Sequence, residues 1–133
     1  MDVGTAAHAG ALWVGLHIFL LLALSLLVVR QRRLHGVALG DGDVAVLTRA
    51  IRAFGNATEY VPAGMAAIVM LAVVGAPPAA VHITGGVMFV GRVVHALSIS
   101  RSSAASLARA IGVMMTWLAY VFAGVALLFY AIG

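Results

Sequence analysis

The sequence predicts an all-α integral membrane protein in which four transmembrane helices form one bundle. Hydrophobic residues make up 64% of the 133 residues and charged residues only 9%, whereas soluble domains contain about 45–50% apolar and about 25% charged residues. Four apolar runs approach or exceed the roughly 20 residues that cross a bilayer. The positive charges gather in alternate connections between these runs. The length is that of one domain.

Each apolar run is expected to be a helix, because a segment inside lipid must satisfy its own backbone hydrogen bonds. The first is ALWVGLHIFLLLALSLLVV, residues 11–29. The others are expected at about residues 54–74, 81–99 and 107–132. A Gly-Asp-Gly-Asp turn signal separates the first run from the second. The two prolines of GAPPAA separate the second from the third, ending one helix and starting the next.

The arginines predict how the helices are oriented in the membrane. The first connection contains Arg30, Arg32, Arg33 and Arg49, and the third contains Arg101 with Arg109 at its edge. The second connection and both termini have no arginine or lysine. The positive-inside rule therefore predicts cytoplasmic first and third connections, with both termini outside. Because the charge follows the first apolar run instead of preceding it, we expect a mature helix there and not a signal peptide.

Four polar residues share one face at the start of the second predicted helix. Arg49, Arg52, Asn56 and Glu59 fall within about 80° of arc, since each helical residue advances about 100°. Glu59 lies about 10 Å deeper than Arg52, and an ionisable group inside the membrane is by default a functional hypothesis. The alternative is that Asn56 and Glu59 only join neighbouring helices through polar contacts.

Arg92 is the partner that the sequence predicts for Glu59. The second and third helices run in opposite directions, so both residues lie about 10 Å from the cytoplasmic end. We expect Glu59 and Arg92 to form a buried ion pair, which either interpretation of Glu59 accepts. His95 lies on the same face as Arg92, one turn nearer the cytoplasm.

Together these positions predict a cationic pocket at the cytoplasmic end of the bundle. Its expected members are Arg30, Arg32 or Arg33, Arg49, Arg52, Asn56, Glu59, Arg92, His95 and Arg109. The planar guanidinium of arginine holds carboxylates or phosphates bidentately, so the expected ligand is a small polyanion. Cysteine is absent, so any thiol must arrive with a ligand. No pair of histidines has a clear metal-ligand spacing, and no metal is expected.

Three motifs resemble the MAPEG family, the membrane-associated proteins in eicosanoid and glutathione metabolism. RAFGNATEYVP resembles the family's helix-two signature, which reads Arg-x-x-x-Asn-x-x-Glu-Tyr-x-Pro. GRVVHA resembles its Gly-Arg-x-x-His motif on helix three, and RAIGVMMTWL resembles the start of helix four in bacterial members. The resemblance covers nearly the whole chain, so residues 1–133 are interpreted as one membrane domain of the bacterial type.

The resemblance implies a homotrimer that binds glutathione between subunits near the cytoplasmic face of a bacterial inner membrane. It implies a detoxifying glutathione transferase or peroxidase that acts on lipophilic substrates. The positions matching those that contact glutathione are Arg52, Asn56, Glu59, Tyr60 and His95, with Arg49 expected in the same pocket. Arg30 or Arg32 is expected to hold a glutathione carboxylate. Arg109 matches the arginine that stabilises the thiolate and is the expected catalytic residue.

Two positions depart from the family pattern and leave other functions open. Gly55 stands where some members have a second arginine, and Ile99 stands where several active enzymes have a tyrosine. Eicosanoid specialisation is therefore not expected. One alternative is a non-catalytic membrane binder of a small anionic thiol or a lipid headgroup. A proton or ion pathway is disfavoured, because the outer halves of the second and third helices are almost entirely apolar.

Overall fold

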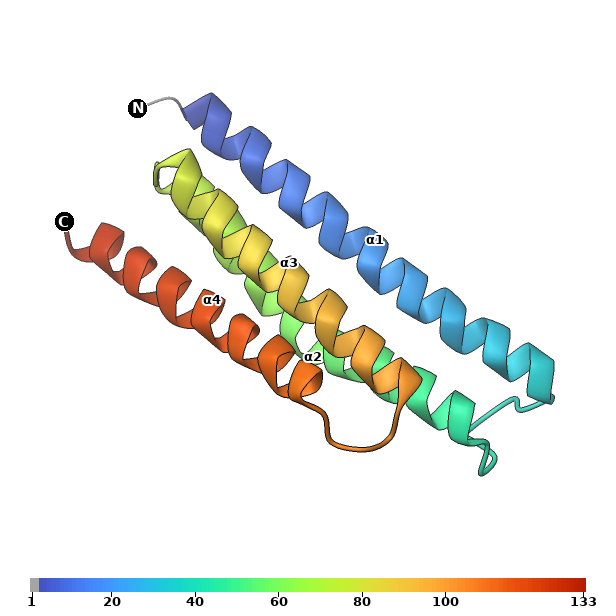
Figure 1. Cartoon of the computed structure of the whole chain (residues 1–133). Coiled ribbons are helices and arrows are strands. Elements are labelled where there is room, and N and C mark those ends of the chain that lie inside the picture. Colours follow the sequence, from blue (N-terminus) through green and yellow to red (C-terminus); the bar gives the residue numbers. More distant parts are fainter. Residues whose placement is uncertain (1–2) are drawn as a thin grey trace.

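Four long helices make up the protein in the computed structural model, which describes residues 3–133 (Figure 1). They are α1 (Val3–His35), α2 (Ala45–Val73), α3 (Pro78–Arg101) and α4 (Leu107–Ile132). Each is long and apolar enough to cross a membrane. The predicted all-α, four-helix membrane bundle is confirmed.

Three of the four helices extend beyond the apolar runs by which the sequence located them. The last helix has the predicted bounds, whereas α1 continues for six residues past Val29 and α2 begins nine residues before Phe54. At 1.5 Å per residue, a helix of 33 residues is about 50 Å long, compared with a hydrocarbon layer of about 30 Å. Hydropathy finds only the part inside lipid, while the helical hydrogen bonds continue into the polar region.

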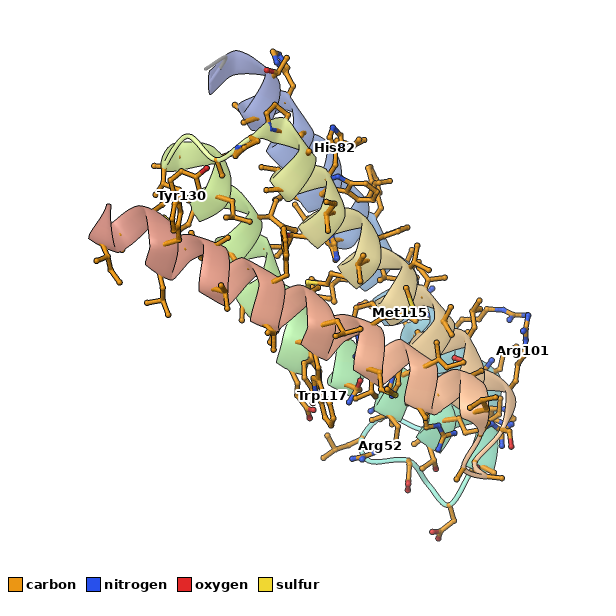
Figure 2. The ribbon with its side chains drawn as sticks, turned by 60° about the vertical axis from the view of Figure 1, so that its left-hand side comes forward. Arg52, His82, Arg101, Met115, Trp117 and Tyr130 are labelled. Carbon is orange, nitrogen blue, oxygen red and sulfur yellow. The ribbon has the colours of Figure 1, made fainter. Side chains whose placement is uncertain are left out.

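The order of the helices in space places α2 and α3 in the middle of the bundle. On one side α1 packs against both of them, and on the other side α4 does the same. Within the described residues α1 and α4 are not neighbours. The start of α1 and the C-terminus lie at one end of the bundle, and the α1–α2 and α3–α4 connections lie at the other (Figure 1). Arg52 and Arg101 are at the end with the connections, opposite His82 and Tyr130 (Figure 2).

Small residues fill much of the space between the helices. Of the seven residues in the core cluster near the middle of the bundle, four are alanines, namely Ala53, Ala57, Ala96 and Ala119. Large apolar side chains instead point outward: Phe19 is 69% exposed and Phe129 is 72% exposed. Small residues allow membrane helices to approach closely, while large ones can contact lipid. Small side chains therefore lie inside the bundle and large apolar side chains lie on its outer surface, an arrangement that a bilayer permits.

Asp41 anchors the α1–α2 connection to the first turn of α2. Its carboxylate accepts hydrogen bonds from the backbone N–H of Asp43 at 3.2 Å and from the Thr48 hydroxyl at 3.0 Å. The backbone turns here through positive φ angles at Gly40, Gly42 and Asp43, a conformation that aspartate tolerates better than most residues. The Asp43 N–H and, next, the Thr48 hydroxyl lower the pKa of Asp41.

These hydrogen bonds predict a pH dependence of stability at the start of α2. The folded pKa of Asp41 is lowered. The stabilisation of the folded state by this carboxylate is therefore complete above the unfolded pKa of about 3.9 and is lost as pH falls through the folded pKa. Asp41→Asn should lower the melting temperature at neutral pH, and the gap to wild type should close on acidification. Thermal unfolding in detergent across this range checks it, and a gap independent of pH contradicts the assignment.

Candidate functional site

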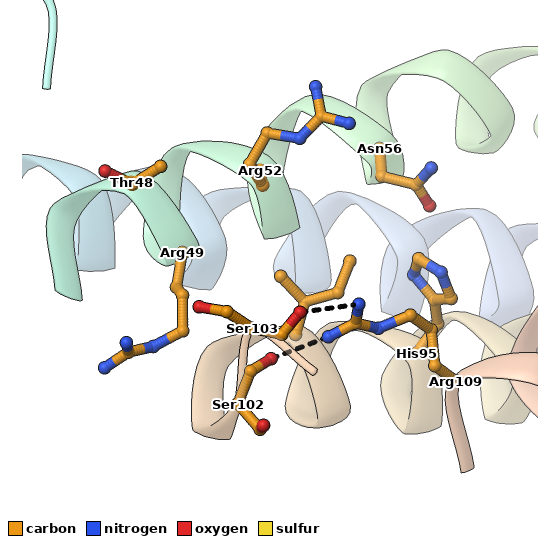
Figure 3. Close-up of a pocket in the computed structure, with 9 residues that line it drawn as sticks. Thr48, Arg49, Arg52, Asn56, His95, Ser102, Ser103 and Arg109 are labelled. Carbon is orange, nitrogen blue, oxygen red and sulfur yellow. Dashed lines mark hydrogen bonds between the residues drawn. The ribbon is translucent and has the colours of Figure 1, made fainter. Parts of the chain in front are cut away.

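A cavity of about 330 Å³ opens at the end of the bundle that carries the connections (Figure 3). It lies between α2, α3, the α3–α4 connection and the first turn of α4. This volume is within the range of about 300–1,000 Å³ typical of small-molecule sites. The residues that line the cavity are Thr48, Arg49, Arg52, Asn56, His95, Ile99, Ser102, Ser103 and Arg109. We call this cavity the arginine pocket.

The helix α2 supplies three of the predicted residues from one face. Arg49, Arg52 and Asn56 follow at spacings of three and four, and all three line the arginine pocket (Figure 3). Arg49 is partly held, because its Nε donates to the carbonyl of Ser100 on α3 at 3.3 Å. Arg52 is exposed and has no hydrogen bond or ion pair to any of residues 3–133. Its guanidinium is therefore available to a ligand.

Arg109 reaches the pocket from the opposite side, at the start of α4. Its Nη2 donates to the Ser102 carbonyl at 2.6 Å and its Nη1 to the Ser103 carbonyl at 3.5 Å (Figure 3). The Ser106 hydroxyl caps the helix by accepting from the Arg109 backbone N–H at 3.2 Å. Arg109 Nε is buried and has no hydrogen-bond partner among the described residues. The α3–α4 connection thus holds this guanidinium in place through main-chain oxygens.

The charge of the arginine pocket has one sign. Its lining includes three arginines and no aspartate or glutamate. The first turn of α4 adds the partial positive charge of free backbone N–H groups at a helix N-terminus. Guanidinium groups that face a shared cavity without a carboxylate make a site for an anion with several acceptor atoms.

Directly beside the pocket, Arg92 is buried between α2, α3 and α4 with only 1% of its surface exposed. Its Nη1 donates to Asn56 Oδ1 at 2.6 Å, its Nε to Thr116 Oγ1 at 2.7 Å and its Nη2 to the Gly112 carbonyl at 3.3 Å. The guanidinium also lies over the Tyr60 ring, 4.8 Å from its centroid. All these partners are neutral, and they come from α2 and α4.

The predicted ion pair between Glu59 and Arg92 is wrong for the protomer. Glu59 is exposed and bonds to none of the residues from 3 to 133, while Arg92 has its full set of neutral partners. The reason is helical geometry: Glu59 lies about 140–160° around α2 from the buried Ala57 and Gly64. Glu59 and Arg92 lie on antiparallel helices, but the Glu59 side chain is exposed while that of Arg92 is buried.

Three other predicted ligand residues lie outside the arginine pocket. Arg30 is exposed on α1. Arg32 donates to the carbonyls of Val37 at 3.4 Å and Gly40 at 2.8 Å, which folds it onto its own connection. Tyr60 packs under Arg92 instead of lining the cavity. A role for these residues in binding glutathione stays a prediction.

Some lining residues have no feature that made them stand out in the sequence. Thr48, Ser102 and Ser103 are short polar residues next to arginines, and only the folded α3–α4 connection brings the two serines to α2. Thr116 also was not singled out, although it is a hydroxyl in an apolar helix seven residues after Arg109. A hydroxyl in an apolar helix often forms a hydrogen bond to a neighbouring membrane helix, so this feature of the sequence indicates Thr116.

A second cavity, of about 350 Å³, shares His95 and Arg109 with the arginine pocket. Its other lining residues are Ala105, Ser106, Ala110, Val113, Met114 and Trp117. Met114 and Trp117 are 57% and 54% exposed on the outer face of α4. His95 and Arg109 therefore stand between a polar cavity at the bundle end and an apolar one on its lipid-facing side. We call the second one the apolar cavity.

Comparison with known proteins agrees with the fold and the motifs. The profile described as "MAPEG family" matches residues 10–129 of the chain. The chain is 41% identical over 85 residues to the inner membrane protein YecN of Escherichia coli strain K12, and equally to YecN of strain O6:H1 (CFT073). The match covers 64% of this chain and 65% of each relative, so it spans less than two thirds of their length. With four membrane-crossing helices and a family match over most of its length, the chain is an integral membrane protein that belongs to the MAPEG family.

Proposed function

We propose that the chain is a membrane-bound glutathione-dependent transferase or peroxidase that acts on lipophilic electrophiles. The observation that carries this proposal is the arginine pocket, which arginines from α2 and α4 line together and whose lining includes no acidic residue. Family membership adds support, because the resemblance implied glutathione chemistry for these positions.

Glutathione matches the chemistry of the pocket. It has two carboxylates, which suit the bidentate geometry of arginine, and we assign them to Arg49 and Arg52. Asn56 would add an amide hydrogen bond. The glutathione ammonium needs an acceptor that the pocket lining does not include. We assign it to Glu59 of a neighbouring protomer in a homotrimer, where Arg30, Arg32 and Tyr60 would also approach the ligand.

The proposed reaction is nucleophilic attack by the glutathione thiolate. A cation near sulfur favours the thiolate, and each unit by which the thiol pKa falls from about 8.5 corresponds to 1.36 kcal/mol. Arg109 is placed to supply that cation. With an aryl halide, the thiolate sulfur forms a bond to the carbon, and the halide leaves with the electron pair. With a hydroperoxide, the thiolate sulfur attacks the outer oxygen, the O–O bond breaks, and the alkoxide leaves and takes up a proton to become an alcohol. A second glutathione then reacts with the resulting glutathione sulfenic acid, which gives the disulfide and water.

The apolar cavity offers an approach for the lipophilic substrate. Its walls are mainly aliphatic and aromatic, its outer residues are exposed on α4, and it meets the arginine pocket at His95 and Arg109. A substrate dissolved in the bilayer could thus reach the sulfur without crossing the aqueous side. Along this route the electrophilic atom of the substrate would meet the glutathione sulfur beside Arg109.

For orientation, we propose a bacterial inner membrane with the arginine-rich connections in the cytoplasm and both termini outside. The relative named above is an inner membrane protein, and the arginines lie at the bundle end that the positive-inside rule assigns to the cytoplasm. Cytoplasmic glutathione would then have direct access to the arginine pocket.

Titration calorimetry of the detergent-solubilised protein with glutathione tests the binding step. Arg52→Ala should weaken binding about tenfold or more, because a hydrogen bond to a charged group contributes about 1.5–3 kcal/mol. Arg101→Ala is the matched control, since Arg101 is also exposed at this end of the bundle but does not line the pocket. Wild-type protein that binds no glutathione, or equal losses in both variants, would contradict the assignment.

One observation favours a second function, the non-catalytic binding of a small anionic thiol or lipid headgroup. Both terminal nitrogens of Arg109 are engaged by the carbonyls of Ser102 and Ser103. A guanidinium that stays committed to these carbonyls keeps its charge but offers a thiolate fewer hydrogen-bond donors. Glutathione binding without conjugation of a generic aryl halide would support this function over catalysis.

A further inference from the structure

The orientation of the Asn56 side-chain amide is fixed by its neighbour. Arg92 Nη1 donates to Asn56 Oδ1 at 2.6 Å. Because a guanidinium has only donors, the atom of the amide that faces it must be the oxygen. The two N–H groups of Asn56 Nδ2 have no partner among the described residues, and Asn56 lines the arginine pocket. With Oδ1 committed to Arg92, the atom of the amide that is left to bind a ligand is the donor Nδ2. Figure 3 shows the Asn56 side chain among the residues that line the pocket.

Arg92 is itself held from several sides, so it cannot release the amide easily. The Thr116 hydroxyl donates to the Gly112 carbonyl at 3.0 Å, which leaves the Thr116 oxygen lone pairs to accept from Arg92 Nε at 2.7 Å. Gly112 also accepts from Arg92 Nη2 at 3.3 Å, and the Tyr60 ring covers one face of the guanidinium. These contacts fix the position of the buried Arg92 guanidinium.

We propose that Arg92 is a positioning residue: it locks Asn56 as a hydrogen-bond donor and so selects an acceptor group in the ligand at that point of the pocket. This inference rests on the proposed function and deepens it, because the carboxylates and thiolate of glutathione are acceptors. A ligand ammonium at the same point would oppose donor to donor, since it has no acceptor. Leaving such groups unpaired is costly in a buried site.

The change of Asn56 to aspartate tests the direction of this hydrogen bond. Aspartate keeps an oxygen for Arg92 and gives its charge a partner, but it places a carboxylate oxygen toward the pocket where Nδ2 was. The variant should keep or raise the melting temperature, while glutathione affinity in calorimetry should fall at least about tenfold, as expected for a lost charge-assisted hydrogen bond. Gln31→Glu is the matched control, since Gln31 is the other side-chain amide of the chain and lies on α1 outside the pocket.

A double-mutant cycle separates positioning from a general structural role. If Arg92 acts through Asn56, the affinity lost in Arg92→Met should largely disappear in the Asn56→Ala background. Arg92→Lys retains a donor for Asn56 Oδ1 and should recover most of the affinity that Arg92→Met loses. Additive losses, or equal losses in the lysine and methionine variants, overturn the proposal. The aspartate measurement stands by itself where a variant at Arg92 does not fold.

Inorganic phosphate as a second probe distinguishes failure of this proposal from failure of the proposed function. If wild-type protein binds phosphate but not glutathione, and Asn56→Asp weakens phosphate, the donor orientation holds and the glutathione assignment fails. If Asn56→Asp binds either probe as tightly as wild type, the role of Arg92 is overturned and the proposed function stands. Wild-type protein that binds neither probe overturns both.

Discussion

Replacement of Gly112 by alanine is expected to destabilise the bundle, because the added methyl group would meet the backbone of α3. A Cβ at this position would lie 2.7 Å from the Gly91 carbonyl oxygen and 2.8 Å from the backbone nitrogen of His95. These are backbone atoms, so relief requires α3 and α4 to move apart. Overpacking of this kind costs about 1–3 kcal/mol, and thermal unfolding in detergent should show the loss as a lower melting temperature.

Gly124→Ala on the same helix is the matched control. Nothing lies within 4 Å of a Cβ built at Gly124, and alanine is favoured over glycine inside a helix by about 0.5–1 kcal/mol. The melting temperature of this variant should therefore be unchanged or higher. Equal effects at the two positions would mean that α3 and α4 are not in backbone contact at Gly91 and Gly112.

Removal of the Arg109 side chain is expected to have the largest effect on the proposed reaction. Loss of one donor that stabilises developing or bound negative charge lowers the rate about 10²–10³-fold. In Arg109→Ala the pKa of bound glutathione should also rise toward the free value of about 8.5, so thiolate would form only at higher pH. The measurements are aryl-halide conjugation and the ultraviolet absorbance of the thiolate as functions of pH.

Arg109→Ala removes hydrogen bonds to the α3–α4 connection as well as the positive charge, and a lysine variant can separate these two effects. Arg109 also holds the α3–α4 connection through the Ser102 and Ser103 carbonyls, so alanine loosens the pocket wall. Arg109→Lys keeps the positive charge but loses the two-pronged hydrogen bond. If charge stabilises the thiolate, lysine should preserve most of the pH profile. An alanine variant with the wild-type profile would show that Arg109 only holds the connection.

The polar stripe on α2 shows how far a sequence pattern predicts a site. Helical spacing was enough to predict that Arg49, Arg52 and Asn56 share a face, and all three line one cavity. The same spacing included Glu59, which is exposed. An angle along one helix cannot say where the neighbouring helices sit, and the boundary between the pocket and the outer surface runs between Asn56 and Glu59.

What the sequence by itself determined is the class of protein and the location of its charge. Four apolar runs, arginines in alternate connections and a polar stripe predicted a membrane bundle with a cationic end, because hydropathy and helical periodicity are properties of one chain segment at a time. Only the tertiary structure decided that Arg92 bonds to Asn56, Thr116 and Gly112. It also brought Ser102 and Ser103 to the pocket wall. Those contacts depend on the rotation and separation of packed helices and on the path of a connection, which no pattern within one segment specifies.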